Sequence, residues 1–218
     1  MISAAIFDMD GLLTDSEPRW HQAELEVAAE IGLQMTVEDL KKTMGVRMVE
    51  VAQIWYENTP WEGPTPAEVA ERVVDRVIEL GESATCLPGV VDTLDLVEEA
   101  GLRVALCSSS DKRLIDATLE QLGLASRFEL AHSAETNEYG KPHPMPYLET
   151  AQGIGVRPSE CLAFEDSLNG CISARAASMQ VVAVPDPEMV DTSQFGFCAE
   201  VLVSLDDMTP SMLARLIR

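Results

Sequence analysis

The sequence predicts an α/β fold: a doubly wound parallel sheet with a Rossmann-like core and a small all-helical domain inserted after the first strand. Two observations predict the sheet, because short apolar runs alternate with segments of helical periodicity and each run is continuously apolar. A third predicts the insert, because residues 15–84 carry helix signals only. We therefore expect an α/β core formed by residues 1–14 and 85–218, with the helical domain between them.

The strands are predicted from five short apolar runs. They are Ala4–Phe7, Val104–Cys107, Leu162–Phe164 and Val181–Val184, with a weaker one at Val201–Val203. Runs of this length without polar alternation are typical of strands that are buried on both faces of a parallel sheet. A regular succession of strand, helix and strand indicates βαβ units, which wind helices onto both faces.

Two amphipathic helices are predicted between these strands, each ending at a glycine, as helices commonly do. Their apolar repeats are Val90, Val91, Leu94 and Val97 before Gly101, and Leu114, Ile115, Thr118, Leu119 and Leu122 before Gly123.

The helical insert is predicted from caps and periodicity. Thr65 and Glu68 form a capping box with Pro66 at the first helical position, and Thr36 marks another helix start. The apolar faces are Trp20, Ala23, Val27 and Ile31 before Gly32, and Val69, Ala70, Val73, Val74, Val77 and Ile78 before Gly81.

Composition excludes several classes of protein. Of 218 residues, 15 are Lys or Arg and 37 are Asp or Glu, which gives a net charge of −22. A general nucleic-acid binder needs a basic surface, and so does a protein that docks on an anionic membrane. No apolar run is long enough to cross a membrane. The five cysteines form no C-x-x-C pair, and the start of the chain does not resemble a signal peptide. We therefore expect a cytoplasmic protein whose cysteines are reduced thiols. We also expect the protein to be a monomer.

Polar side chains follow three of the predicted strands. Asp8 and Asp10 follow the first, Ser108 the second, and Glu165 with Asp166 the third. Ligands of open parallel sheets bind outside the carboxyl ends of the strands, so these side chains are expected to converge. Clustered carboxylates repel one another unless a cation is present, and an all-oxygen donor set suits Mg²⁺. Phosphoryl transfer with a carboxylate nucleophile is the chemistry that such a site favours.

The same segments resemble, in order, the four motifs of the haloacid dehalogenase superfamily of phosphohydrolases. They are Asp8-Met9-Asp10-Gly11-Leu12-Leu13, Ser108, Gly140-Lys141-Pro142-His143-Pro144 and Glu165-Asp166-Ser167-Leu168-Asn169-Gly170. The helical insert is similar to the small cap of that family. Within it, the first motif resembles those of sugar-phosphate phosphatases such as 2-deoxyglucose-6-phosphatase and hexitol phosphatase, and also that of β-phosphoglucomutase.

This resemblance implies a role for each acidic residue. Asp8 would be the nucleophile and a Mg²⁺ ligand. Asp10 would protonate the leaving alcohol, then activate water, and would bind the metal through its backbone carbonyl. Asp166 would complete the metal site, with Glu165 as a direct or water-mediated partner.

The resemblance also implies which residues bind the phosphorylated substrate. Ser108 and the Ser109 amide would hydrogen-bond the phosphoryl group, and Lys141 would offset its charge. Arg47 is a candidate substrate contact from the cap, because an anionic ligand needs some positive charge there. Asn169 is either part of the site or a local hydrogen-bonding residue at a helix start.

Three alternatives stay open. A sugar phosphomutase of the β-phosphoglucomutase type would place a histidine where this chain has Trp20, and His21 is one position away. A receiver-like domain phosphorylated on aspartate would explain neither the insert nor Asp10. A phosphonate hydrolase would need a lysine in the cap, but Lys41 and Lys42 are expected to be a solvated pair. Hydrolysis of a small phosphorylated sugar or polyol is therefore the favoured function.

Overall fold

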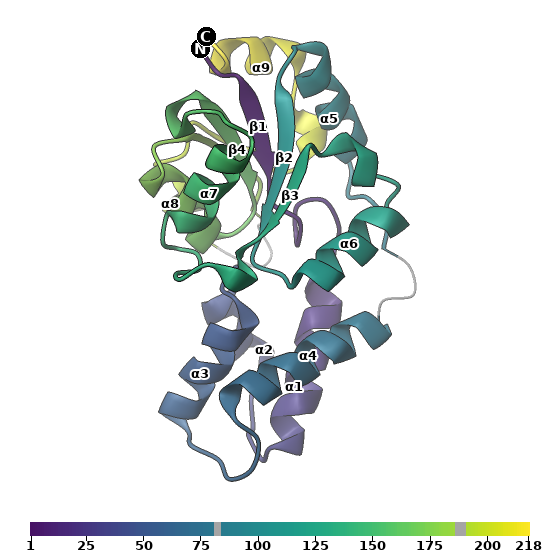
Figure 1. Ribbon diagram of the computed structural model, residues 1–218, viewed down its shortest axis with the longest axis vertical. Helices are drawn as coiled ribbons and strands as arrows, with labels where there is room; N and C mark the ends of the chain where they lie inside the picture. The colour runs from purple at the N-terminus through teal and green to yellow at the C-terminus, as the bar shows by residue number, and fades with distance from the viewer. Residues whose placement is uncertain (81–83, 186–190) are drawn as a thin grey trace.

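A computed structural model describes residues 1–80, 84–185 and 191–218. Its centre is a six-stranded sheet in the order β3-β2-β1-β4-β5-β6, in which every neighbouring pair is parallel (Figure 1). The strands are β1 (Ala4–Phe7), β2 (Arg103–Ser108), β3 (Leu130–Ser133), β4 (Cys161–Glu165), β5 (Gln180–Ala183) and β6 (Glu200–Val201). The predicted α/β class with a doubly wound parallel sheet is confirmed.

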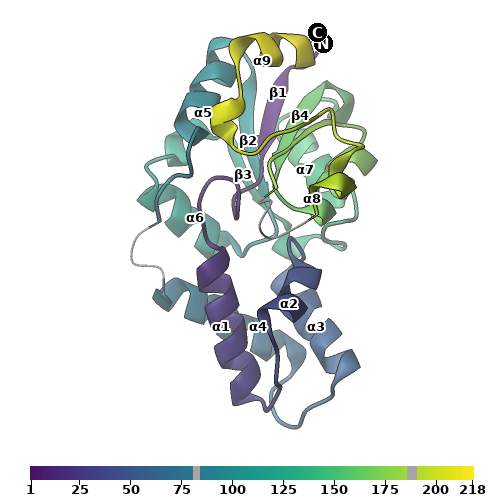
Figure 2. The ribbon, with the colours of Figure 1, turned by 180° about the vertical axis from the view of Figure 1, so that it is seen from behind.

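Helices cover both faces of this sheet. On β1, Ala5 and Phe7 pack in the core beneath α5, α6 and α9, whereas Ala4 and Ile6 pack in the core beneath α7 and α8. Figure 1 shows α7 and α8 on one side of the sheet, and Figure 2 shows α5 and α9 on the other. These helices are α5 (Val90–Glu99), α6 (Lys112–Gln121), α7 (Met145–Gly153), α8 (Leu168–Ala176) and α9 (Pro210–Leu216).

The helical insert lies beyond the carboxyl ends of the strands and has its own apolar core (Figures 1 and 2). It consists of α1 (Glu17–Glu30), α2 (Val37–Leu40), α3 (Met48–Asn58) and α4 (Pro66–Leu80), of which α4 packs against both α1 and α3. The chain passes between insert and sheet through two adjacent segments, because Thr14 and Cys86 form an antiparallel bridge. None of the described helices is long and apolar enough to cross a membrane.

The helix boundaries agree with the predicted caps. Both capping-box interactions are present at Thr36, and the side chains of Thr65 and Glu68 hydrogen-bond as expected. The predicted stop at Gly81 lies outside the described residues. Two side chains of the predicted apolar faces, Ile78 and Val91, are exposed instead of buried.

One strand was not predicted. β3 is an edge strand whose first three residues are only half-buried, and it ends in His132 and Ser133. An edge strand needs no continuous apolar run, since one side of it faces solvent. At the other edge, β6 is shorter than the predicted run, and the side chain of Val203 is 73% exposed.

Candidate active site

The strand order brings three of the four predicted carboxylates together. β1 lies between β2 and β4, so that Asp8 at the end of β1 is next to Glu165 and Asp166 at the end of β4. One carboxylate oxygen from each of these three residues lies within 4.8 Å of the others, and all three residues are buried. Asp166 Oδ1 has no hydrogen-bond partner among the described residues. A buried, unpartnered oxygen beside two other carboxylates fits a hard divalent cation, for which oxygen donors are the usual ligands.

Lys141 balances this cluster from the loop that precedes α7. Its Nζ donates to Asp8 Oδ1 at 2.8 Å, to Glu165 Oε1 at 2.6 Å and to the carbonyl oxygen of Cys107 at 3.1 Å. Although burial lowers the pKa of Lys141, the charges of Asp8 and Glu165 outweigh this and raise it well above its usual value. The ammonium group is therefore permanent and is held against the nucleophile expected at Asp8.

The single positive charge of Lys141 does not neutralise all three carboxylates of the cluster. Burial raises the pKa of Asp8 to about 7, with Lys141 opposing and Glu165 adding to the shift. Burial, and then the charges of Glu165 and Asp8, raise the pKa of Asp166 well above its usual value. Groups in such an environment bind either protons or a metal ion. At neutral pH, a divalent ion would keep these carboxylates ionised.

Glu165 is more completely hydrogen-bonded than its neighbours. Besides Lys141, its Oε1 accepts from the Tyr147 hydroxyl at 2.9 Å. Its Oε2 accepts from the backbone N–H and the hydroxyl of Ser167, both at 3.1 Å. These bonds fix the position of Glu165 within the cluster. Sequence reasoning missed Tyr147, which only the packing of α7 against the sheet brings to this point.

The side chain of Asp10 points toward the helical insert and is not part of the carboxylate cluster. Its Oδ1 accepts from the Ser16 hydroxyl at 2.6 Å and from Trp20 Nε1 at 3.2 Å, and its Oδ2 accepts from the Ser110 hydroxyl at 2.6 Å. The N-cap of α6 is Asp111, which accepts from the Arg113 N–H at 2.9 Å, and not the preceding Ser110. The Ser110 hydroxyl is thereby available to Asp10.

Ser108, Ser109 and Asn169 differ in what they contact. Ser108 lies at the carboxyl end of β2, where its oxygen accepts from the Ser110 N–H at 3.0 Å. The Ser109 hydroxyl donates to the carbonyl of Gly45 at 2.8 Å, and Asn169 Nδ2 donates to the carbonyl of Met44 at 2.9 Å. The side chains of Ser109 and Asn169 thus hold the loop before α3 against the core. Their predicted contacts with a phosphoryl group stay predictions.

Arg47 joins the insert to the core in a different way. Its Nη1 donates to the carbonyls of Ala134 at 3.1 Å and Asn137 at 2.5 Å, while Nη2 pairs with Glu50 Oε1 at 2.5 Å. The side chain is 8% exposed, and its Nε has no partner within the described part of the chain. The guanidinium is therefore largely satisfied by the protein, and a substrate contact by Arg47 stays a prediction.

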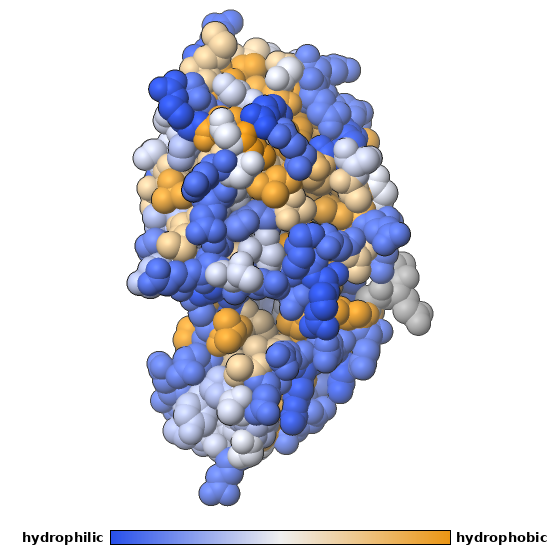
Figure 3. Space-filling view, in the orientation of Figure 1, coloured by the Kyte–Doolittle hydropathy of each residue, from blue (hydrophilic) through white to orange (hydrophobic). Residues whose placement is uncertain are grey.

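A cavity of about 480 Å³ separates the insert from the sheet. Asp8, Asp10, Ser108, Lys141 and Asp166 line it from the sheet, and α1, α3 and α4 line it from the insert. Figure 3 shows hydrophobic side chains along the narrow waist where the two parts meet. Among the described residues, the lining includes eight carboxyl groups but only two lysine or arginine side chains, Arg47 and Lys141. An anionic ligand would thus need a cation at the carboxylate cluster.

Comparison with known proteins places the chain in a family. Residues 2–178 match the family model of haloacid dehalogenase-like hydrolases. The chain is 43% identical over 210 residues to hexitol phosphatase B of Escherichia coli K12, which covers 95% of each protein. It is 33% identical to fructose-1-phosphate phosphatase of the same strain, over 82% of this chain and 94% of that protein.

Solved structures agree with this fold. β-Phosphoglucomutase from Clostridium difficile superposes with a TM-score of 0.88 at 24% identity, over 100% of this chain and 97% of that one. CbbY from Rhodobacter sphaeroides superposes with a TM-score of 0.84 at 22% identity, over 95% and 96%. On the family model and these relatives, the chain belongs to the haloacid dehalogenase-like hydrolases, and among them to the phosphatases.

Proposed function

We propose that this protein is a Mg²⁺-dependent phosphatase that hydrolyses a small phosphorylated sugar or polyol, of the hexose-6-phosphate or 2-deoxyglucose-6-phosphate type, through an aspartyl-phosphate. One observation carries the proposal: the buried cluster of Asp8, Glu165 and Asp166, with Lys141 against Asp8, on the sheet side of the cavity between the sheet and the insert. The 43% identity to hexitol phosphatase B supports the substrate class.

In the first half of the reaction, a carboxylate oxygen of Asp8 attacks phosphorus and the bond from phosphorus to the ester oxygen breaks. Protonated Asp10 gives its proton to the departing oxygen, so that the alcohol leaves neutral. In the second half, Asp10 takes a proton from the attacking water and Asp8 is released as a carboxylate. A Mg²⁺ ion held by Asp8, Asp166 and the Asp10 carbonyl, with Glu165 beside them, would neutralise charge on the phosphoryl oxygens.

The phosphoryl group would be held from the sheet side of the cavity. Ser108 lies at the end of β2 next to Asp8 on β1, so its hydroxyl can donate to a phosphoryl oxygen. The Ser109 N–H would add a second donor, while Lys141 keeps a fixed positive charge against Asp8. Donors fixed before the substrate arrives need no reorganisation as charge develops.

We also propose that residues 15–84 form a cap domain that closes the site. The antiparallel bridge between Thr14 and Cys86 supports this. The two segments that connect the insert to the core lie side by side there, so the insert can rotate against the core about this point. Contacts from Arg47, Ser109 and Asn169 hold the closed arrangement without using a group of the carboxylate cluster. A closed cap excludes bulk water and restricts the leaving group to small molecules. Such an enzyme would act as a cytoplasmic monomer.

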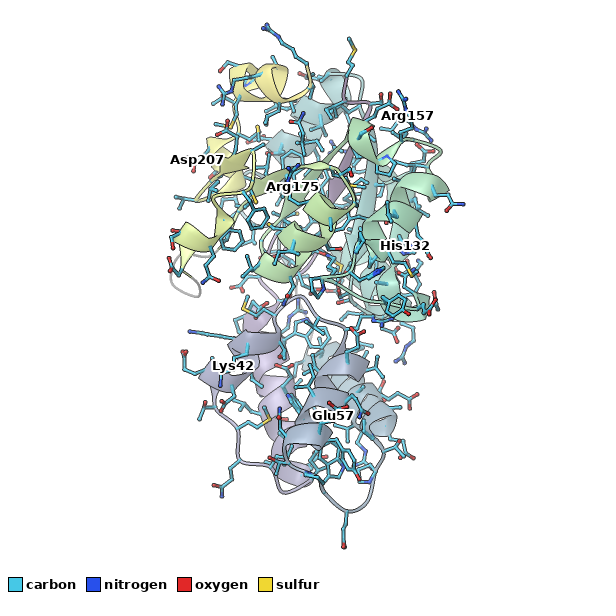
Figure 4. The ribbon with its side chains drawn as sticks, turned by 90° about the vertical axis from the view of Figure 1, so that its left-hand side faces the viewer. Lys42, Glu57, His132, Arg157, Arg175 and Asp207 are labelled. Atoms are coloured by element: carbon cyan, nitrogen blue, oxygen red, sulfur yellow. The ribbon has the colours of Figure 1, made fainter. Side chains whose placement is uncertain are left out.

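Two alternatives are less well supported than hydrolysis. A mutase must bind a phosphorylated sugar at both ends, yet Arg47 is occupied by Glu50 and two backbone carbonyls. A phosphonate hydrolase would need a free lysine in the cavity. Lys42 lies on the outer side of the insert, 72% exposed and paired with Asp39 (Figure 4), and Lys41 pairs with Glu38.

The test is phosphate release from a panel of sugar, polyol and nucleotide monophosphates, with Mg²⁺ or with EDTA. We expect hydrolysis of hexose or hexitol 6-phosphates with Mg²⁺, loss of at least about 99% of the rate in EDTA, and recovery when Mg²⁺ is restored. A rate unaffected by EDTA would contradict the metal site. Conversion of a hexose 1-phosphate to the 6-phosphate without free phosphate would identify a mutase instead.

A further inference from the structure

Glu24 is a buried carboxyl group for which the proposed mechanism has no use. It lies in α1, is 8% exposed and lines the cavity from the insert side. Among the residues that the structure describes, none donates a hydrogen bond to its carboxyl group or forms an ion pair with it. Its oxygens are not among the fully buried atoms without a partner, so they are open to the cavity. Buried carboxyl groups are normally paired, so an unpaired one that faces a cavity indicates a partner that enters from outside.

The surroundings of Glu24 keep it protonated. Burial raises its pKa to about 8, and the nearby charge of Glu17 adds to the shift. Glu17 itself lies 3.3 Å from His21 Nε2, and burial lowers the pKa of that imidazole. A protonated carboxyl group both donates and accepts a hydrogen bond, as a hydroxyl-bearing ligand requires.

Besides Glu17, His21, Thr43 and Glu71, the rest of the described insert wall is largely apolar and carries almost no positive charge. Leu40, Met48, Val51, Ala70 and Val74 make up much of its apolar surface. Among the described residues on this wall, Arg47 is the only lysine or arginine, and its guanidinium is already bound to the core and to Glu50.

We infer that the Glu24 carboxyl group binds a hydroxyl of the departing alcohol and makes the enzyme specific for uncharged polyhydroxy monophosphates. Substrates that carry a second phosphate or a carboxylate are rejected. The inference rests on the proposed function, since it assigns the leaving-group side of the same cavity. A buried group built to bind a hydroxyl discriminates strongly against analogues without it, because it is then left unpaired. A second anion would lie near the charge of Glu17 and would find no free lysine or arginine among the described residues of that wall.

Two substrates that differ at one carbon test this specificity. Sorbitol 6-phosphate carries a hydroxymethyl group where 6-phosphogluconate carries a carboxylate. Values of kcat/KM for both, with Mg²⁺, should be measured for the wild type, Glu24→Gln and Glu24→Leu, with p-nitrophenyl phosphate as a substrate lacking sugar hydroxyls. Glu71→Gln is the matched control, because Glu71 is an exposed carboxylate at the same cavity. Thermal unfolding establishes that each variant is folded.

We expect kcat/KM of the wild type to be at least about 100-fold higher for sorbitol 6-phosphate than for 6-phosphogluconate. Glu24→Leu should lower kcat/KM for sorbitol 6-phosphate by about 10- to 100-fold more than for p-nitrophenyl phosphate, since the hydroxyl loses its partner. Glu24→Gln keeps a donor and an acceptor and, like the protonated carboxyl group, carries no charge, so it should retain both the kcat/KM for sorbitol 6-phosphate and the preference over 6-phosphogluconate within about fivefold. Glu71→Gln should leave the preference within about twofold.

Three results would overturn the inference while the phosphatase assignment stands. They are a wild-type preference for 6-phosphogluconate, an unchanged ratio of kcat/KM for sorbitol 6-phosphate to that for p-nitrophenyl phosphate in Glu24→Leu, and a Glu71→Gln effect on this ratio as large as that of Glu24→Leu. If the wild type hydrolyses none of the three compounds with Mg²⁺, the proposed function fails and the inference fails with it.

Discussion

The two walls of the cavity are built on different principles. On the sheet wall, Asp8 and Glu165 are buried and both pair with Lys141, and Asp166 lies beside them as a third carboxylate. On the insert wall, Glu24 is also buried, but it has no hydrogen-bond or ion-pair partner within the described part of the chain, and many of the side chains around it are apolar. Under the proposals above, the first wall would bind a metal ion and the second would bind a hydroxyl group of the ligand. Chemistry and selectivity are thereby assigned to different parts of the chain.

We expect the largest effect from a substitution on the sheet wall, at the proposed nucleophile Asp8. Asp8→Asn preserves the shape of the side chain but removes the attacking carboxylate, so kcat should fall by at least about 10³-fold, the scale on which loss of a nucleophile acts. Phosphate release with sorbitol 6-phosphate and with p-nitrophenyl phosphate measures it. Both substrates should be affected alike, in contrast to Glu24→Leu. Wild-type turnover by Asp8→Asn would disprove the nucleophile assignment.

The next largest effect compares how much a buried ion network and a surface ion pair contribute to the free energy of unfolding. Lys141→Met leaves two buried carboxylates without their cation, so the free energy of unfolding in EDTA should fall by about 3–5 kcal/mol. Lys112→Met is the matched control, since Lys112 pairs with Asp116 on the exposed face of α6 and should cost at most about 1 kcal/mol. Urea unfolding monitored by circular dichroism gives both values. Equal losses in the two variants would argue against a special role for the buried lysine.

We expect the smallest effect on the insert wall, in the pH dependence of the free energy of unfolding to which Glu24 contributes. The carboxyl group of Glu24 has an unfolded pKa of 4.5 and a folded pKa of about 8, so between these values the folded protein holds a proton that the unfolded chain has lost. Its contribution to stability is therefore complete below pH 4.5 and is lost as the pH rises toward 8.

Glu24→Gln does not titrate, so it should reduce the loss of stability between pH 5 and 8 by about 2–3 kcal/mol. Urea unfolding of the variant and the wild type in EDTA at both pH values isolates this residue, because Asp8 and Asp166 titrate in both proteins. Glu71→Gln, which alters an exposed carboxylate, should follow the wild-type curve. Parallel curves for Glu24→Gln and the wild type would show that Glu24 is ionised in the folded protein.

The sheet wall could be predicted from the sequence far better than the insert wall. Strand ends in a parallel sheet meet at one edge whatever the rest of the chain does, so the apolar runs before Asp8, Ser108 and Glu165 were enough to bring them together. Resemblance to a known motif added Lys141, whose three hydrogen bonds no local pattern indicates. β3 was missed because its polar edge residues carry no apolar run.

Contacts between the two parts of the chain could not be predicted. The partners of Arg47 and Asn169 lie about ninety and 125 positions away, at Asn137 and Met44, and no spacing rule links them. Glu24 did leave a signal that was overlooked. It follows Trp20 by four residues and so lies on the apolar side of α1, where a charged residue is out of place. Helical periodicity identified the apolar face of α1, but it did not draw attention to Glu24 on that face.

The indole of Trp20 donates its Nε1 hydrogen to Asp10, the residue assigned to proton transfer. Indole emission responds to the charge and hydration next to the ring. The fluorescence of this tryptophan can therefore report, without any added label, when the acid leaves its resting hydrogen bonds. In a background where Trp55 and Trp61 are replaced by phenylalanine, the motion of a single carboxylate becomes visible in a stopped-flow trace.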